Sequence, residues 1–350
     1  MWRRPDVDAL PAPRTPDPAA APPLRWGVLG TGWIAERFVA ALLRSTRQQV
    51  AAVGSRDLPR SRAFADRFGV ARAYGSYEDL VADDDLDVVY VATPHNAHRP
   101  CARLALEAGR HCLVEKQIGL NAGEARELAD LAAGRGLFCM EALWSLFLPK
   151  FDVLRQLLAA GALGEVRTVL ADMGEHFGPD HRIMSAALAG GPLLDLGTYP
   201  VMLATEVLGE PDTVLALGRP TEAGDGVNGQ TAILLGTAAG QQAVLHTTLF
   251  SDTDTRAVIA GTEGTLSLDG PFYQPGPFTL TRYADGQVLR HDEPAVAHEA
   301  LHFQAAEVAR CVDAGLRESP LRTLAATVRT MAVLDEVRRQ VGIVFAEERG

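Results

Sequence analysis

Several classes of protein are excluded by what this sequence of 350 residues lacks. It has no uninterrupted apolar run approaching the ~20 residues that a membrane span needs. It has four cysteines, none in a CxxC or CxxH cluster, so we expect core thiols in a reducing cytoplasm and no metal site. Positive charge is also scarce, because 33 Lys and Arg stand against 44 Asp and Glu, a net charge of −11. Such a balance argues against a nucleic-acid or anionic-membrane partner.

The pattern along the chain predicts a tail and two domains. Residues 1–23, rich in Pro and Ala, are predicted to be a disordered tail. In 24–145, buried strands alternate with amphipathic helices, including one expected at 100–108, which predicts a doubly wound parallel sheet. In 146–350 we expect an α/β domain with an open, mostly antiparallel sheet. Its expected strands are 165–172, 213–218, 231–236, 242–249, 256–260, 264–269 and 278–283. Helices at about 298–315 and 320–341 would close the chain, with the option of packing back on the first domain.

The first motif with chemical meaning is Gly30-x-Gly32-x-x-Ala35, between an expected strand and an expected helix. The first glycine permits a tight turn, the second lets backbone N–H groups approach a diphosphate, and Ala35 permits close packing. The phosphates would then rest on the positive end of the helix. The residues expected to contact the cofactor here are Gly30, Thr31, Gly32, Trp33 and Ile34. An ordinary strand–helix turn and a methyltransferase-type glycine loop are the alternatives.

The end of the second strand indicates which dinucleotide binds. An NAD enzyme would carry Asp or Glu at this place to bind the ribose 2′-hydroxyl, whereas this chain has Ser55 and Arg56. A hydroxyl beside a guanidinium suits a 2′-phosphate, and Arg60 can assist from the next helix. We therefore expect NADP rather than NAD, although Asp57 is adjacent and a merely solvated Arg56 is the alternative.

The third strand ends at Thr93-Pro94-His95-Asn96-x-His98. Ligands bind at the carboxyl edge of such sheets, so we expect Thr93, Pro94, His95 and His98 to contact ribose or nicotinamide. The alternative is that Asn96 or His98 caps a helix that begins near residue 99.

The fourth strand, 111–114, runs directly into Glu115 and Lys116. A buried strand would be destabilised by an inward ammonium, so the charged pair is expected at the carboxyl edge, facing the cofactor crevice. There Lys116 can donate to ribose and substrate hydroxyls and lower the pKa of a neighbouring acid. A surface ion pair is the alternative.

The last motif is Gly190-Gly-Pro-Leu-Leu-Asp195-Leu-Gly-Thr-Tyr199-Pro200. In one helix Asp195 and Tyr199 would share a face, but Pro200 should kink that turn. A free tyrosine titrates near ~10, and a nearby ammonium such as that of Lys116 would favour the phenolate and suit Tyr199 to proton transfer. A core or interface aromatic is the alternative for Tyr199.

Together these motifs resemble the glucose–fructose oxidoreductase/inositol dehydrogenase/MocA (Gfo/Idh/MocA) family, from about residue 24 to the last helix. The segments at 140–158 and 197–200 look closest to the dihydrodiol dehydrogenase and D-xylose dehydrogenase branch. The resemblance implies an N-terminal Rossmann domain and a C-terminal α/β domain whose open sheet often forms a dimer interface.

The resemblance also implies roles for three residues. Lys116 matches the family's active-site lysine, Tyr199 stands where many members have a histidine and is given the acid–base role, and Asp195 matches an aspartate that orients substrate. One departure concerns the residue after the lysine, which is Gln117 here and usually proline in the family. Because the proline is often in a cis bond there, the direction of Lys116 depends on this turn.

We therefore predict an NADP-dependent dehydrogenase acting on a hydroxyl carbon of an aldose, cyclic polyol or trans-dihydrodiol. Tyr199 would take the hydroxyl proton, while Lys116 and Asp195 hold substrate hydroxyls in reacting position. The expected state is a cytoplasmic homodimer or homotetramer. The alternatives are a glycosidase that uses NAD(P) without net redox change and a non-catalytic dinucleotide-binding sensor.

Overall fold

The computed structural model describes residues 9–221 and 227–348. The chain divides into two compact units. The first comprises 16–147 and 298–331. The second comprises 148–297 and the chain from 332 onwards, together with the chain up to residue 15. In the described part of the chain, we find no helix with the length and apolar character of a membrane span.

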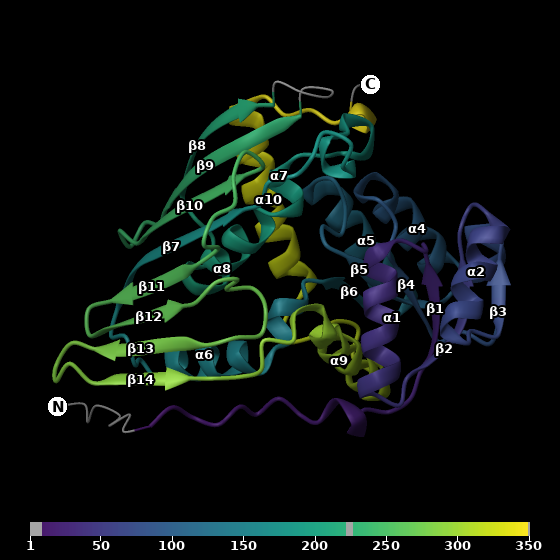
Figure 1. Cartoon of the computed structure of the whole chain (residues 1–350), viewed down its shortest axis with the longest axis horizontal. Coiled ribbons are helices and arrows are strands. Elements are labelled where there is room, and N and C mark those ends of the chain that lie inside the picture. Colours follow the sequence, from purple (N-terminus) through teal and green to yellow (C-terminus); the bar gives the residue numbers. More distant parts are fainter. Residues whose placement is uncertain (1–8, 222–226, 349–350) are drawn as a thin grey trace. The chain divides into compact units, whose positions relative to one another are not determined.

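The first unit contains a parallel sheet of six strands in the order β3-β2-β1-β4-β5-β6 (Figure 1). The strands are β1 (Arg25–Leu29), β2 (Gln49–Gly54), β3 (Arg72–Tyr74), β4 (Val88–Val91), β5 (His111–Glu115) and β6 (Cys139–Ala142). Every residue of β4 and β6 is buried, as expected for strands covered on both faces. This is the doubly wound sheet that the alternating pattern predicts, and β3 is too short to have been recognised in the sequence.

The helices of the first unit follow the same alternation. They are α1 (Trp33–Ser45), α2 (Leu58–Phe68), α3 (Tyr77–Val81), α4 (His95–Glu107), α5 (Ala122–Arg135) and α9 (His302–Asp313), with short 3₁₀ turns η1 (Pro18–Ala20), η2 (Trp144–Phe147) and η5 (Ala297–Leu301). The final helix α10 (Leu324–Val341) contributes its first turns to this unit and the rest to the other.

Helix α4 differs from the expectation at its start. The sequence predicts a helix at 100–108, but α4 already begins at His95, with Pro94 as the N-cap residue in an extended conformation. Asn96 and His98 therefore lie inside the first turns, and neither is an N-cap. Pro100 is tolerated within the helix, so it did not mark the start that we expected.

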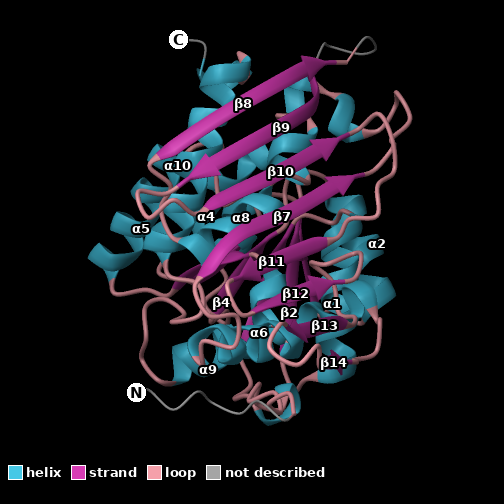
Figure 2. Ribbon diagram, turned by 90° about the vertical axis from the view of Figure 1, so that its left-hand side faces the viewer, coloured by secondary structure: helices cyan, strands magenta, loops and turns pink. Residues whose placement is uncertain are grey.

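The second unit contains a sheet of eight strands in the order β14-β13-β12-β11-β7-β10-β9-β8. Figure 2 shows this sheet from its open face. The strands are β7 (Val166–Gly174), β8 (Thr213–Pro220), β9 (Asn228–Gly236), β10 (Gln242–Thr248), β11 (Ala257–Gly261), β12 (Gly264–Leu268), β13 (Phe278–Arg282) and β14 (Val288–His291). Neighbours pair antiparallel except β7 with β10, which are parallel. The mostly antiparallel sheet is thus confirmed, and β14, with only four residues, was not predicted.

Helices and turns complete the second unit. They are α6 (Pro149–Ala159), α7 (Pro192–Asp195) and α8 (Thr198–Leu208), together with η3 (Arg182–Met184), η4 (Ala186–Leu188) and η6 (Ala346–Glu348). Pro200 was expected to kink one helix over 192–200. The structure instead has two helices. Helix α7 ends at Asp195, and α8 starts at Thr198 with Pro200 in its first turn, where a proline is tolerated.

The tail prediction needs correction for the residues that the structure describes. Residues 1–8 lie outside them, but 9–23 make specific contacts. In the second unit, Asp152 on α6 accepts a hydrogen bond from the backbone N–H of Arg14, and Gln156 donates to the carbonyl of Ala12. In the first unit, Ala21 is buried against α9. Prolines leave such a segment little conformational entropy to lose, so a few contacts can order it.

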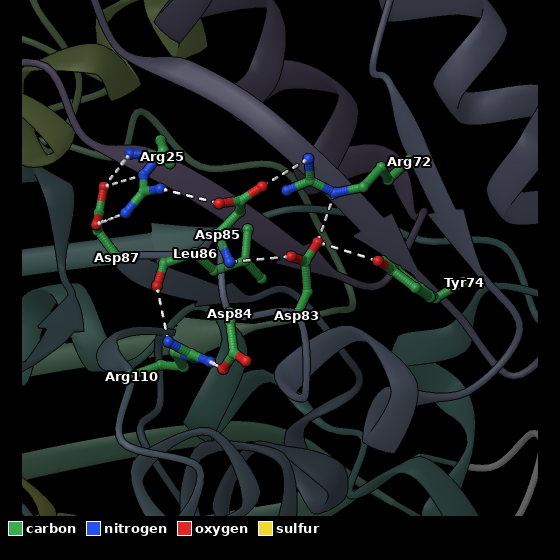
Figure 3. Close-up of polar contacts among 9 residues, drawn as sticks. All are labelled: Arg25, Arg72, Tyr74, Asp83, Asp84, Asp85, Leu86, Asp87 and Arg110. Carbon is green, nitrogen blue, oxygen red and sulfur yellow. Dashed lines mark hydrogen bonds and ion pairs between the residues drawn. The ribbon is translucent and has the colours of Figure 1, made fainter.

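Charged residues fix the turn before β4 at the amino end of the parallel sheet (Figure 3). The arginines are Arg25, Arg72 and Arg110, and they bind Asp87, Asp83 and Asp84, with Asp85 shared between the first two. The bidentate hydrogen bonds from Arg25 hold the pKa of Asp87 below its ordinary value. Since cofactors bind at the opposite edge of such sheets, we assign this network to stability.

All four cysteines are buried, and none forms a disulfide. Burial raises the pKa of Cys101 to about 11 and that of Cys311 to about 12. At neutral pH these thiols are protonated and unreactive, which is the core role predicted for them.

Candidate functional site

The glycine turn between β1 and α1 is shaped to receive an anion. Gly30 has φ +104°, and a Cβ there would lie 2.5 Å from the carbonyl oxygen of Ala92, so only glycine fits. Gly32 is the N-cap of α1 and provides no side-chain hydrogen bond to the helix. A Cβ at Gly32 would meet nothing within 4 Å, which leaves open space before the helix end. The first N–H groups of α1 can therefore approach a diphosphate, and the site fits a dinucleotide.

After β2, Ser55 is buried and hydrogen-bonded, whereas Arg56 and Arg60 are exposed. The Ser55 hydroxyl is buried and donates 2.8 Å to the carbonyl of Asp57, and it lies 2.9 Å from the hydroxyl of Ser61. Ser55 therefore shapes the turn into α2. Arg56 and Arg60 are exposed, and neither guanidinium forms an ion pair with any residue in 9–221 or 227–348. Two cations without an ion pair in the described residues, one just after β2 and one in the first turn of α2, suit a phosphate.

At the end of β4, Thr93 and His95 are buried, and Pro94 leads the chain into α4. His98, one turn further on, is also buried. Its Nδ1 lies 2.5 Å from the carbonyl oxygen of Gln117 and its Nε2 lies 2.7 Å from that of Thr93. Because carbonyl oxygens only accept, both contacts are hydrogen bonds when the ring carries a proton on each nitrogen. His98 thus joins the ends of β4 and β5, and its nitrogens face the backbone.

At the end of β5, Glu115 is buried while Lys116 is partly exposed. The Glu115 carboxylate accepts from the hydroxyl of Tyr90 at 2.5 Å and from the backbone N–H of Lys116 at 3.2 Å. The Lys116–Gln117 peptide bond is cis. Glu115 therefore holds the strand end, and Lys116 is the one of the pair that reaches solvent.

The loop after Lys116 is held by further contacts. The backbone N–H of Ile118 donates 3.3 Å to Glu141 on β6, while His98 holds the carbonyl of Gln117. The side chain of Gln117 is fully buried, and its amide makes no hydrogen bond to the described residues. Because β2, β1, β4 and β5 are adjacent and parallel, their carboxyl ends lie along one edge. The structure thus brings the first unit's predicted residues to that edge.

A residue that the sequence did not indicate joins this edge from the far end of the chain. His298 lies in η5, and its ring packs edge-on against Trp33, with 4.7 Å between ring centroids, and at 5.5 Å from the ring of Trp144. Burial, together with the charges of Arg37 and Lys116, lowers the pKa of His298 to about 4. A lone histidine in a helical stretch gives no signal of this contact in the sequence.

In the second unit, Asp195 and Tyr199 lie on successive helices. Asp195 ends α7, is largely buried, and accepts 2.8 Å from the guanidinium of Arg182 in η3. That ion pair fixes the carboxylate. No motif in the sequence indicated Arg182 as a partner of this aspartate.

Tyr199, in the first turn of α8, stacks on Tyr273 with 4.2 Å between ring centroids and an angle of 28° between ring planes. Both phenols are largely buried. Burial raises the pKa of Tyr273, which also receives a hydrogen bond from Gln274 and lies near the charges of Glu175 and Asp195. Tyr273 therefore remains protonated at neutral pH. The sequence did not predict this partner of Tyr199.

The parallel sheet, the glycine turn and the uncapped end of α1 define a dinucleotide-binding oxidoreductase fold. Comparison with known families agrees, since residues 24–143 match the oxidoreductase family with an NAD-binding Rossmann fold and residues 151–267 match the GFO/IDH/MocA C-terminal domain. The chain belongs to the Gfo/Idh/MocA family of oxidoreductases, as its motifs predicted.

Relatives of known activity are similar over nearly their whole length. Trans-1,2-dihydrobenzene-1,2-diol dehydrogenase from Bos taurus is 35% identical over 341 residues, which cover 93% of this chain and 99% of that protein. The enzyme of the same name from Homo sapiens is 34% identical over 340 residues, with the same coverage. These relatives support a dehydrogenase.

Solved structures share the fold. A 3-ketoreductase from Actinomadura kijaniata in complex with NADP and TDP-benzene has a TM-score of 0.81 and 28% identity, covering 91% of this chain and 98% of that one. Levoglucosan dehydrogenase in complex with NADH and levoglucosan has a TM-score of 0.82 at 17% identity, covering 92% and 98%, and shows the fold alone. Both nicotinamide cofactors thus occur among the structural neighbours.

Proposed function

We propose that this protein is an NADP-dependent dehydrogenase that oxidises a hydroxyl carbon of a trans-dihydrodiol, a cyclic polyol or an aldose. The observation that carries the proposal is the stacked pair of Tyr199 and Tyr273 beside the fixed carboxylate of Asp195, in a chain whose first unit is a dinucleotide-binding fold. The relatives named for dihydrodiol oxidation support the same chemistry.

The preference for NADP rests on the end of β2. A 2′-phosphate carries charge that Arg56 and Arg60 can neutralise, and neither is committed to a described carboxylate. The serine at position 55 adds a hydroxyl turned toward Asp57 and Ser61 rather than a carboxylate that would repel the phosphate. Glu115, by contrast, is engaged by Tyr90 and serves to hold the strand end beside Lys116.

The proposed roles follow from the chemistry of each side chain. Tyr199, which stacks on Tyr273 near Asp195, takes the hydroxyl proton of the substrate, the acid–base role that the family motif implies for it. Asp195, fixed by Arg182, accepts a hydrogen bond from a substrate hydroxyl. Lys116 donates to substrate or ribose hydroxyls. When bound, NADP supplies the hydride acceptor.

The aromatic surface favours a ring-shaped substrate. The two tyrosine rings stack as one rigid unit, and buried aromatic faces bind rings through apolar contact. The carboxylate of Asp195 orients a hydroxyl on such a ring. A cyclic diol satisfies both groups, and so does a pyranose.

We propose that the protein is a homodimer or homotetramer that associates through the open face of the eight-stranded sheet. Four exposed apolar residues lie directly opposite one another across adjacent strands, in the order Leu215, Leu234, Val244 and Leu170. Leu217 on the same edge strand is 77% exposed. A continuous apolar row of this kind is typical of an interface between subunits.

The proposed activity is tested by following NADP reduction at 340 nm with a panel of trans-dihydrodiols, inositols and aldoses. We expect turnover with at least one cyclic diol or polyol and lower affinity for NAD. Binding of the cofactor without reduction by any member of the panel would contradict the dehydrogenase assignment. Release of chromophore from a p-nitrophenyl glycoside, without net NADPH change, would identify the glycosidase alternative.

A further inference from the structure

His298 occupies an unusual position for a residue so late in the chain. It belongs to the Rossmann unit, in the 3₁₀ turn η5 that precedes α9. Its ring lies against Trp33, the first residue of the helix that follows the glycine turn, and against Trp144 after β6. The next residue, Glu299, pairs with Arg44 at the end of α1, with 2.6 Å between Oε2 and Nη1. The turn is therefore fixed along α1.

The ring of His298 is available to a ligand. Neither ring nitrogen hydrogen-bonds to any residue within 9–221 and 227–348, and the ring is only partly buried. Trp33 beside it is 55% exposed. The aromatic contacts hold the imidazole in one place, and its polar atoms are left unused by the described protein.

The charges around His298 are positive. Arg37, one turn along α1, lies with its guanidinium carbon 5.5 Å from the ring centroid of Trp33, and Lys116 acts from the end of β5. The carboxylate of its own turn, Glu299, is bound to Arg44, and η2 contributes no charged side chain. In the free protein the imidazole is accordingly neutral, because burial and these two cations lower its pKa to about 4.

Such surroundings fit an anion rather than a cation. The open N-terminus of α1 begins at Trp33, and its partial positive charge adds to those of Arg37 and Lys116. The diphosphate of a dinucleotide would bring negative charge to this cluster. It would oppose the effect of the two cations on the pKa of His298, since an opposite charge favours the charged form of a group.

We propose that His298 completes the cofactor site, where it binds the phosphate–ribose backbone of the dinucleotide and takes up one proton from solvent as the cofactor binds. This inference rests on the proposed function only in requiring a nicotinamide dinucleotide as ligand. It adds a residue from the late part of the sequence to a cofactor site whose other proposed residues all lie before residue 117.

The sign of the effect follows from linkage. The pKa of His298 is low in the free protein and raised in the complex, so cofactor binding strengthens as the pH falls below the pKa of the complex. The affinity changes by up to about tenfold per pH unit in that window and levels off near pH 4, where the free protein is also protonated.

The experiment is calorimetric titration of NADP⁺ into the whole protein between pH 5 and 7.5, in pairs of buffers that differ in ionisation enthalpy. We expect uptake of up to about one proton per site in the wild type and a clearly smaller uptake in His298→Gln. The cofactor's own 2′-phosphate titrates in both proteins and cancels in the comparison. His246→Gln, on β10 of the other unit, is the matched control and should retain the full uptake.

Two outcomes separate this inference from the proposed function. Equal proton uptake in the wild type and His298→Gln would overturn the role of His298 while leaving the cofactor assignment intact. Failure of the wild type to bind NADP⁺ or NAD⁺ would overturn both. If the variant does not fold, an NMR titration of the His298 ring in the wild type decides the matter: a pKa that rises with NADP⁺ supports the proposal, and an unchanged one refutes it.

Discussion

Glu141 on β6 and Arg322 form a fully buried ion pair, with 2.9 Å between Oε2 and Nη2. The same carboxylate accepts from the hydroxyl of Thr327 and from the backbone N–H of Ile118, in the loop that carries Lys116. Arg322 also donates to Thr330 on α10. One buried carboxylate thus ties the end of the Rossmann sheet, the first turns of α10 and the Lys116 loop together.

Removal of one partner should be strongly destabilising. We expect Arg322→Met to lower the free energy of unfolding by about 3–5 kcal/mol, because Glu141 is left as an uncompensated buried charge. Urea unfolding followed by circular dichroism measures the change. The double variant Glu141→Gln with Arg322→Met should recover part of the loss, and a double variant as unstable as the sum of the single ones would show that the pair is not coupled.

Tyr199→Phe should lower turnover by about 10²–10⁴-fold, because the phenol is the proposed proton acceptor. Binding of NADP⁺, measured by calorimetry, should be unchanged, since Tyr199 belongs to the second unit. Tyr273→Phe is the matched control and should retain most of the turnover. A larger loss in Tyr273→Phe than in Tyr199→Phe would reverse the assignment of the base.

A double-mutant cycle with Lys116→Met tests whether the lysine assists the same step. If Lys116 and Tyr199 act on one proton transfer, the combined loss in turnover should be well below the product of the separate losses. Independent action would give the full product. This cycle probes the expectation that the ammonium favours the phenolate of Tyr199.

Arg56→Ala should weaken NADPH binding by about tenfold or more and leave NADH binding nearly unchanged, because a charge-assisted contact to phosphate contributes about 1.5–3 kcal/mol. Arg62→Ala, at an exposed residue on the following helix α2, is the control and should change neither affinity. Fluorescence titration with both cofactors gives the ratio. An equal loss for NADPH and NADH would rule out a 2′-phosphate contact.

Acid should weaken the network around the turn before β4. The hydrogen bonds from Arg25 hold the pKa of Asp87 below its ordinary value. The pKa of Asp83 is also lowered, because its hydrogen bonds from Asp85, Arg72 and Tyr74 outweigh its burial. Their contribution is present above the unfolded-state pKa near ~4 and is lost as the pH falls through the folded-state values. Between pH 5 and 3, stability should fall less steeply in Asp87→Asn than in the wild type, and parallel pH profiles would argue against this linkage.

Leu234→Asp should convert the proposed oligomer into monomers, because it places a charge in the middle of the apolar row on the open sheet. Size-exclusion chromatography with light scattering gives the mass. Leu316→Asp, at another partly exposed leucine in the first unit, should leave the mass unchanged. An unaltered mass in Leu234→Asp would exclude this face as the interface.

The sequence predicts most of the fold because its information is local. The apolar run at 87–92 and the glycine turn at 30–32 indicate a buried strand and a βα junction from neighbouring residues alone, and both are present. The start of α4 was misplaced, because a proline is usually read as a helix boundary and Pro100 is not one. Short strands such as β3 and β14 contain too few residues for an alternation of apolar and polar side chains to be recognised.

The site could be predicted only where a motif is continuous in sequence. Gly30, Arg56, Lys116 and Tyr199 each belong to such a motif. Tyr273, which stacks on Tyr199, and His298, which packs on Trp33, come from distant segments and become neighbours only through tertiary packing. His98 was expected to face the cofactor, and the structure turns both of its nitrogens to backbone carbonyls instead.

The burial of every native thiol has a practical consequence. Maleimide reagents attack thiolates at the surface, and none of the four cysteines is exposed there. A single cysteine introduced at Val288, which is 61% exposed, would therefore be the one rapidly reacting thiol of the chain, with the wild-type background left intact. A fluorophore or spin label attached there would report on the eight-stranded sheet in solution.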